Sequence, residues 1–135
     1  MTKTVHIRTV AGGGASLGWT NGRSLTVDGG AAGGDAHIGF NADELLSFAI
    51  GASYTAHLWQ EATKRQIRIK SLGVEISPEP PAGPGLSVSV TLEADVDEEA
   101  IMDLLERVDK AATTCNQLRL GVPVRVTNAH VIRSG

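Results

Sequence analysis

Apolar and polar side chains alternate near the N-terminus in the pattern of strands. The alternation covers 3–10 and returns over 23–28, with the two-residue period of a half-buried strand. Glycine-rich stretches at 11–14 and 29–36 follow the two runs and are typical of turns and loops. We therefore expect two N-terminal strands, each followed by a loop.

A long helix is expected next, from Asn41 to about Lys64. Asn41 is a good N-cap residue, and Glu44 lies three residues later, as in a capping box. The first two thirds of this segment are apolar on nearly every side, which predicts burial all round. About 24 residues span roughly 36 Å, more than one small chain can wrap, so a second subunit is the natural cover.

The second half of the chain predicts a hairpin. Apolar positions alternate over 67–76, with a change of phase at Ser71 that indicates a bulge or a short break. A proline-rich segment at 78–85 separates this run from a second alternating run at 86–94. The two runs are expected to pair as antiparallel strands.

A second helix and a last strand complete the predicted elements. Acidic residues at 97–99 suit the positive end of a helix, and an apolar stripe continues from Ile101 to Cys115. Residues 122–132 are predicted to form a strand. The expected order is ββαββαβ, an α+β fold with a mostly antiparallel sheet and a long buried central helix.

Length and composition favour one globular domain over residues 1–135. Hydrophobic residues make up 41% of the chain, enough to exclude disorder as its main state. A net charge of −3 without a basic block argues against a nucleic-acid or membrane-surface partner. The N-terminus lacks the apolar core of a signal peptide, so we expect a cytoplasmic protein.

Metal and cofactor chemistry finds little support in the residues. One cysteine cannot form an internal disulfide or a cysteine-built zinc site. The four histidines lack metal-ligand spacing, and the glycine clusters lack the order of a phosphate loop. No cofactor and no metal are therefore expected.

Three side chains remain as candidates for chemistry. Ser53 and His57 are four residues apart on one face of the long helix, which allows either a nucleophile with its base or a structural hydrogen bond. No G-x-S-x-G elbow surrounds Ser53. Cys115 can be a small buried hydrophobe or a redox thiol.

The start of the long helix resembles a known family. Gly39-Phe40-Asn41-Ala42-Asp43-Glu44-Leu45-Leu46, followed by a helix to Ser53-Tyr54, is similar to the segment G-x-N-P-E-[EQ]-L-L…A-A-C-F. That segment is typical of the osmotically inducible protein C / organic hydroperoxide resistance family. The order of the later elements also follows this family over most of the chain.

The resemblance implies an intertwined homodimer and a thiol peroxidase that reduces organic hydroperoxides. In such enzymes a cysteine on the central helix attacks the peroxide and becomes a sulfenic acid. A second cysteine then closes a disulfide, which a small dithiol reduces. A glutamate and an arginine stabilise the first thiolate, the reactive form.

This chain departs from the family at those positions. Ser53 stands where the first cysteine is expected, and Asp43 stands for the glutamate at the helix start. Gly14 follows Gly12 and Gly13 where the arginine is expected, and only the second cysteine remains, as Cys115. A serine hydroxyl forms neither a sulfenic acid nor a disulfide, so a two-cysteine cycle within one chain is impossible.

Three hypotheses follow for the function. The favoured one is a dimer with a degenerate peroxidase site and a binding or accessory role. It would take a small hydrophobic ligand or an organic hydroperoxide at the dimer interface, near Ser53. The residues expected to line this site are Asp43, Tyr54, His57 and Cys115. The alternatives are a one-cysteine hydroperoxide reductase that uses Cys115 and an external thiol, and a serine hydrolase.

Overall fold

The computed structural model describes residues 4–10, 12–28, 38–78, 85–121, 124–130 and 132. The chain divides into two compact units, Met1–Ala49 and Ile50–Gly135. The boundary falls inside the long helix α1 (Ala42–Lys64), whose first two turns belong to the first unit. Each unit has its own antiparallel sheet.

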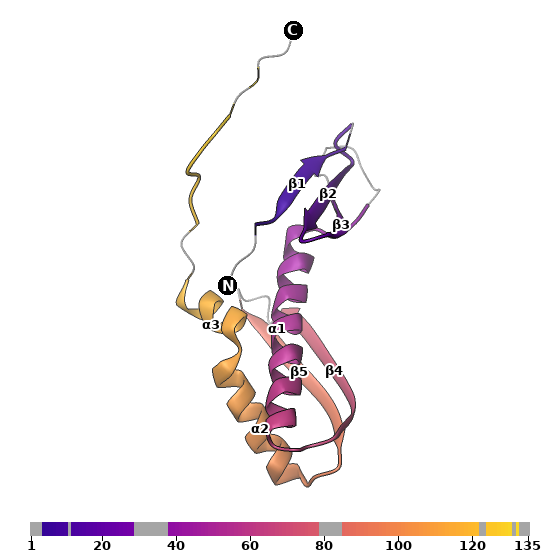
Figure 1. The fold of residues 1–135 in the computed structure, drawn as a ribbon, viewed down its shortest axis with the longest axis vertical. Coiled ribbons are helices and arrows are strands. Elements are labelled where there is room, and N and C mark those ends of the chain that lie inside the picture. Colours follow the sequence, from indigo (N-terminus) through magenta and orange to yellow (C-terminus); the bar gives the residue numbers. More distant parts are fainter. Residues whose placement is uncertain are drawn as a thin grey trace. The chain divides into compact units, whose positions relative to one another are not determined.

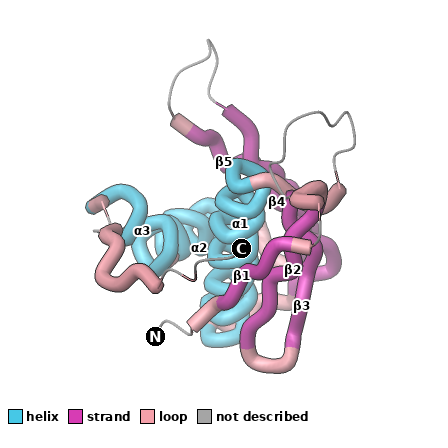
Figure 2. Tube along the Cα trace, turned by 90° about the horizontal axis from the view of Figure 1, so that it is seen from above, coloured by secondary structure: helices cyan, strands magenta, loops and turns pink. Residues whose placement is uncertain are grey.

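The first unit contains a three-stranded antiparallel sheet in the order β1-β2-β3. Its strands are β1 (His6–Thr9), β2 (Ala15–Thr20) and β3 (Arg23–Asp28), which lie side by side in Figure 2. The two expected strands are present as β1 and β3. The strand between them, β2, was not predicted, so the expectation of two strands was wrong by one.

The pattern of β2 explains why it was missed. Its covered positions are Ser16 and Gly18, whereas Leu17 and Trp19 are exposed, so apolar character does not mark the covered face. The sequence feature that could have predicted β2 is the turn that follows it. Asn21 and Gly22 have φ values of 52° and 77°, as the two-residue turn of a hairpin requires, and an Asn-Gly pair is the usual choice there.

Gly39 joins the sheet to the long helix at a point of close backbone approach. The Phe40 N–H donates to the Thr26 carbonyl (3.2 Å), and the Asp28 N–H donates to the Phe40 carbonyl (3.0 Å). Gly39 has a φ of +84°, and a Cβ there would lie 2.5 Å from the Thr26 oxygen. Only glycine fits this position without strain.

The capping box predicted at the start of α1 is confirmed. The Asn41 Oδ1 accepts from the Glu44 N–H at 2.8 Å, and the Glu44 Oε1 accepts from the Asn41 N–H at 2.9 Å. Two backbone donors that have no partner within the helix are thereby satisfied. The helix then continues to Lys64, as expected.

The core of the second unit forms where α1 packs on α2 (Glu98–Ala111) and on a hairpin (Figure 1). Four-residue spacing places the buried side chains of α1 on one stripe. At Gly51 a Cβ would lie 3.6 Å from Ile76, so the helix runs close to the strand. The buried core residues are Ile50, Tyr54, Leu58, Ala62, Leu104, Val108 and Ala112.

Burial of α1 is confined to this stripe in the chain taken by itself. Leu46, Phe48 and Trp59 keep 42%, 58% and 46% of their surface exposed. The sequence led us to expect a helix covered on all sides, with a second subunit supplying part of the cover. In the single chain these three side chains stay exposed, so the expected cover on all sides of α1 is not provided by the chain itself.

The predicted hairpin is confirmed, including its irregularity. Strand β4 (Ile69–Pro78) pairs antiparallel with β5 (Leu86–Ala94), and the register shifts between Ile69 and Ser71. The change of phase in the sequence therefore marks a bulge or irregularity at this place.

The helix predicted to continue through Cys115 is broken in two, which corrects that prediction. Ala112 has φ −64° and ψ 101°, outside the helical region, and α3 (Thr113–Leu120) starts after it. The Asn116 side chain donates to the Lys110 carbonyl at 2.7 Å. Arg119 donates to the Asp109 carbonyl and carboxylate. Hydrogen bonds from side chains of α3 to the end of α2 therefore stabilise the break.

The final strand predicted over 122–132 is absent from the part of this segment that the structure describes. Residues 124–130 and 132 have no strand structure, and Val124 and Val126 are 90% and 88% exposed. Residues 122, 123 and 131 lie outside the described part. A strand requires a neighbouring strand to pair its backbone groups, and these residues have none within the described chain.

The observed order is βββαββαα, and the α+β class with antiparallel sheets is confirmed. No helix within the described ranges is both long and apolar enough to cross a bilayer.

Candidate functional site

Ser53 lies on α1 in the second unit and carries an unpaired polar atom. Its Oγ is buried and has no hydrogen-bond partner within the described residues, although the residue as a whole is only partly buried. A buried hydroxyl without a partner costs about 1–3 kcal/mol. Such a group is a ready donor and acceptor for a molecule bound beside it.

His57 lies one turn further along α1 and contacts the same residue through the backbone. Its Nδ1 is 2.8 Å from the Ser53 carbonyl oxygen, and since a carbonyl only accepts, Nδ1 carries the proton. The imidazole is therefore directed to the main chain and not to Oγ. This arrangement matches the structural hydrogen bond considered above and lacks the nucleophile–base contact of a serine hydrolase.

Tyr54 lies in the core of the second unit. Its side chain is 7% exposed, and its hydroxyl donates to the Leu105 carbonyl of α2 at 3.5 Å. The sequence proposed Tyr54 as a ligand-binding residue. The structure shows a side chain that connects α1 to α2.

The remaining expected site residues are spread along the chain. Asp43 is exposed in the first turn of α1, in the first unit. A Cβ at Gly14 would have no neighbour within 4 Å, so open space surrounds the position where the family arginine was expected. Cys115 belongs to α3 by its backbone, and its side chain lies outside the described part of the structure.

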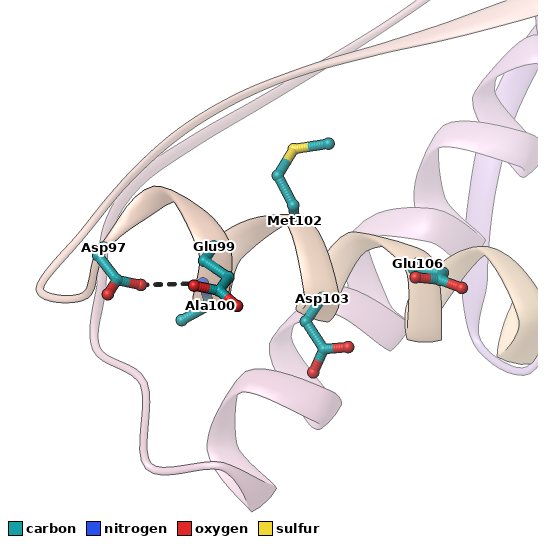
Figure 3. A pocket seen from close by; sticks show the side chains of 6 residues that line it. All are labelled: Asp97, Glu99, Ala100, Met102, Asp103 and Glu106. Carbon is teal, nitrogen blue, oxygen red and sulfur yellow. Dashed lines mark hydrogen bonds between the residues drawn. The ribbon is translucent and has the colours of Figure 1, made fainter.

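A hollow that the sequence did not indicate lies along α2, lined by residues between Asp97 and Glu106 (Figure 3). Its volume is about 790 Å³. The Asp97 carboxylate accepts from the Ala100 N–H, Asp103 pairs with Arg65 at 2.6 Å, and Glu106 pairs with Lys110 at 3.5 Å. These carboxylates are thus engaged in local contacts. No group of three metal-binding side chains occurs among the described residues, and we interpret this hollow as a solvated helix face.

Arg65 connects the end of α1 to α2 through two carboxylates. The hydrogen bond that Arg65 donates to the Asp103 carboxylate raises the pKa of the guanidinium above its ordinary value, and Glu61, 3.4 Å away, adds to this increase. The raised pKa of Arg65 means that the guanidinium keeps its charge until the solution is strongly alkaline. Because the Asp103 carboxylate is well exposed, the pair contributes modestly.

Comparison with known proteins decides the family. The family model described as "OsmC-like protein" matches residues 33–127, which include α1, the β4–β5 hairpin, α2 and α3. The chain belongs to the OsmC-like protein family. A sequence comparison with curated proteins gives no match.

Solved structures of OsmC-like proteins share the fold at low sequence identity. An OsmC-like protein from Mycoplasma pneumoniae is 16% identical with a TM-score of 0.69, over 88% of each chain. An organic hydroperoxide resistance protein from Elizabethkingia anophelis is 19% identical with a TM-score of 0.53, over 88% of this chain and 89% of that one. A protein of the same description from Legionella pneumophila is 16% identical with a TM-score of 0.51, over 88% and 90%. At these identities the likeness establishes the fold alone.

Proposed function

We propose that this OsmC-like chain takes part in the response to organic hydroperoxides without carrying out the two-cysteine peroxidase cycle. Its solved relatives include organic hydroperoxide resistance proteins, which supports the general role. The chain would act in the cytoplasm as a binding or accessory protein. Its ligand would be an organic hydroperoxide or another small hydrophobic molecule.

The observation that carries this proposal is the buried, unpaired Oγ of Ser53. A serine hydroxyl is not appreciably ionised at neutral pH and cannot become a sulfenic acid. It can, however, donate to or accept from the oxygen of a bound hydroperoxide or alcohol. Loss of the reactive thiol with retention of a polar atom at the same position favours binding over turnover.

We also propose that residues 1–135 form one domain and that two copies of the chain assemble. The exposed apolar side chains of α1, Leu46, Phe48 and Trp59, would be covered by the partner in an intertwined homodimer. The ligand site would then form at the interface near Ser53. Its proposed lining consists of Asp43, Tyr54, His57 and Cys115.

The test measures turnover and binding separately. Consumption of cumene hydroperoxide with dihydrolipoamide as reductant is expected to stay at the level of a Cys115→Ser control. Turnover that disappears in this control would overturn the proposal and favour a one-cysteine reductase based on Cys115.

Binding is measured with cumyl alcohol, the unreactive reduction product of the same hydroperoxide. Calorimetric titration is expected to show binding that Ser53→Ala weakens about three- to tenfold, through loss of one hydrogen bond. Equal binding by both proteins, or no binding, would contradict a ligand site at Ser53.

A further inference from the structure

The imidazole of His57 has one nitrogen without a hydrogen-bond partner. Its Nδ1 donates to the Ser53 carbonyl at 2.8 Å, so in the neutral ring Nε2 carries no proton and can only accept. Within the described residues no donor forms a hydrogen bond with Nε2. His57 is partly buried, and Nε2 is not sealed off from the surface. A molecule next to α1 can therefore reach this acceptor.

Ser53 and His57 together present two unpaired hydrogen-bonding atoms on one face of α1. The first is the buried Oγ of Ser53, and the second is the Nε2 of His57. Side chains four residues apart on a helix have their Cβ atoms about 5–6 Å apart, so one small polar group can contact both. Ala52 and Ala56 lie beside the pair and are exposed, and their single methyl groups leave room for an apolar body.

Charged groups next to this pair are already engaged elsewhere. Glu61 follows His57 at four-residue spacing, and its carboxylate lies 3.4 Å from the Arg65 Nε and 3.9 Å from the Lys64 Nζ. Among the residues that the structure describes, no charged side chain forms an ion pair or a hydrogen bond with His57 or Ser53. The pair is thus suited to a neutral polar group.

We propose that His57 determines the specificity of the ligand site at Ser53 by selecting neutral molecules that carry a hydroxyl or hydroperoxyl group. The O–H of the ligand donates to Nε2, and an oxygen of the same group accepts from the Ser53 hydroxyl. An ether or a dialkyl peroxide has no proton for Nε2, and a carboxylate brings a negative charge against its lone pair. The inference rests on the proposed function, in which His57 has only a lining position.

Three probes of similar shape test this selection. They are cumyl alcohol, its methyl ether, and the carboxylate α,α-dimethylphenylacetate. Calorimetric titration is made at about pH 8.5, where imidazole side chains in general are neutral. Cumyl alcohol is expected to bind about ten- to a hundredfold more tightly than the ether, because the ether leaves Nε2 unpaired, and the carboxylate should bind most weakly.

Two substitutions separate recognition from structural support. His57→Asn removes Nε2 but keeps an amide nitrogen that can donate to the Ser53 carbonyl, so it should lose the preference for the alcohol over the ether. His57→Gln places an amide oxygen near the position of Nε2 and should restore part of this preference. Circular dichroism shows whether each variant is folded. A change in preference is a result that a purely structural role of His57 would not give.

Nitrogen NMR of the unsubstituted protein tests the acceptor without relying on a folded variant. In the free protein, the Nε2 signal of His57 is expected at the position of an unprotonated ring nitrogen. Addition of cumyl alcohol should move this signal upfield, and addition of the ether should not. The chain has four histidines, and the spectrum of whichever His57 variant is folded identifies the signals of His57.

Several results would overturn the inference. They are equal affinity for the alcohol and the ether, an unchanged preference in His57→Asn, and a proton on Nε2 in the free protein. If Ser53→Ala weakens binding of cumyl alcohol and His57→Asn does not, this inference fails while the proposed function stands. Absence of binding by every probe would contradict both, so the two failures are distinguishable.

Discussion

At the scale of single residues, the informative positions are those where a side chain is smaller or less reactive than its surroundings would allow. Ser53 has a hydroxyl where the related enzymes are expected to have a thiol, and its Oγ is buried without a partner in the described part of the chain. Gly39 has no Cβ because the Thr26 carbonyl occupies that space. Each makes a prediction about what a substitution would do.

A thiol placed at position 53 tests whether hydroperoxides reach this point. In a Cys115→Ser background, Ser53→Cys is expected to react with cumene hydroperoxide and to form a sulfenic acid. Dimedone trapping followed by mass spectrometry measures this product, with Ser53→Ala in the same background as the control. If the sulfenic acid forms only after the protein is unfolded, hydroperoxides do not reach position 53 in the folded protein.

Replacement of Gly39 tests the close approach of the backbone to Thr26. Gly39→Ala is expected to lower the free energy of unfolding by about 3 kcal/mol, because a positive φ and a steric clash act together. Gly12→Ala is the matched control, since Gly12 has a φ of +90° and no neighbour within 4 Å of a Cβ, and it should cost only about 1 kcal/mol. Urea unfolding measures both values, and equal losses would contradict the clash.

At the scale of elements, the sequence predicted the features that depend on residues close together along the chain. The Asn41–Glu44 capping box and the register shift near Ser71 were both readable from the sequence and are confirmed. The break at Ala112 was not readable, because alanine is the best helix former and the bonds that stabilise the break come from Arg119 and Asn116. Periodicity could not find β2, whose covered positions hold serine and glycine.

Leucines on two faces of α1 should respond differently to the same truncation. Leu58 is fully buried in the core, and Leu58→Ala is expected to lower the free energy of unfolding by about 2–5 kcal/mol. Leu46 is 42% exposed, so Leu46→Ala should instead weaken association of two copies. Chemical unfolding over a range of protein concentrations separates the two effects, and a larger loss for Leu46 in a monomer would contradict this assignment.

At the scale of the whole molecule, the chain leaves apolar surface and strand-like sequence without cover. The fold class and the family followed from the order of elements and the Gly39–Leu46 motif. The candidate site did not follow from spacing alone, since the direction of the His57 ring and the core position of Tyr54 depend on packing. The predicted strand at 122–132 lacks a neighbour within the described chain, where Val124 and Val126 are exposed.

Assembly is the prediction that belongs to this scale. Sedimentation equilibrium is expected to give about twice the mass of the 14.1 kDa chain. The double variant Val124→Asp, Val126→Asp should shift the protein toward the monomer, because it places charges on one face of the expected strand. Arg125→Ser, on the opposite face, is the control. A monomer at every concentration tested would contradict the homodimer.

The Asn21–Gly22 turn also has a consequence for chemical ageing. An asparagine followed by glycine is prone to deamidation, because the next backbone nitrogen attacks the side-chain amide with little hindrance, ammonia leaves, and water opens the ring. The isoaspartate that results adds one carbon to the main chain, so the turn no longer closes with two residues. The pairing of Thr20 with Arg23 depends on this closure. The age of a preparation thus becomes a variable for any measurement on this sheet.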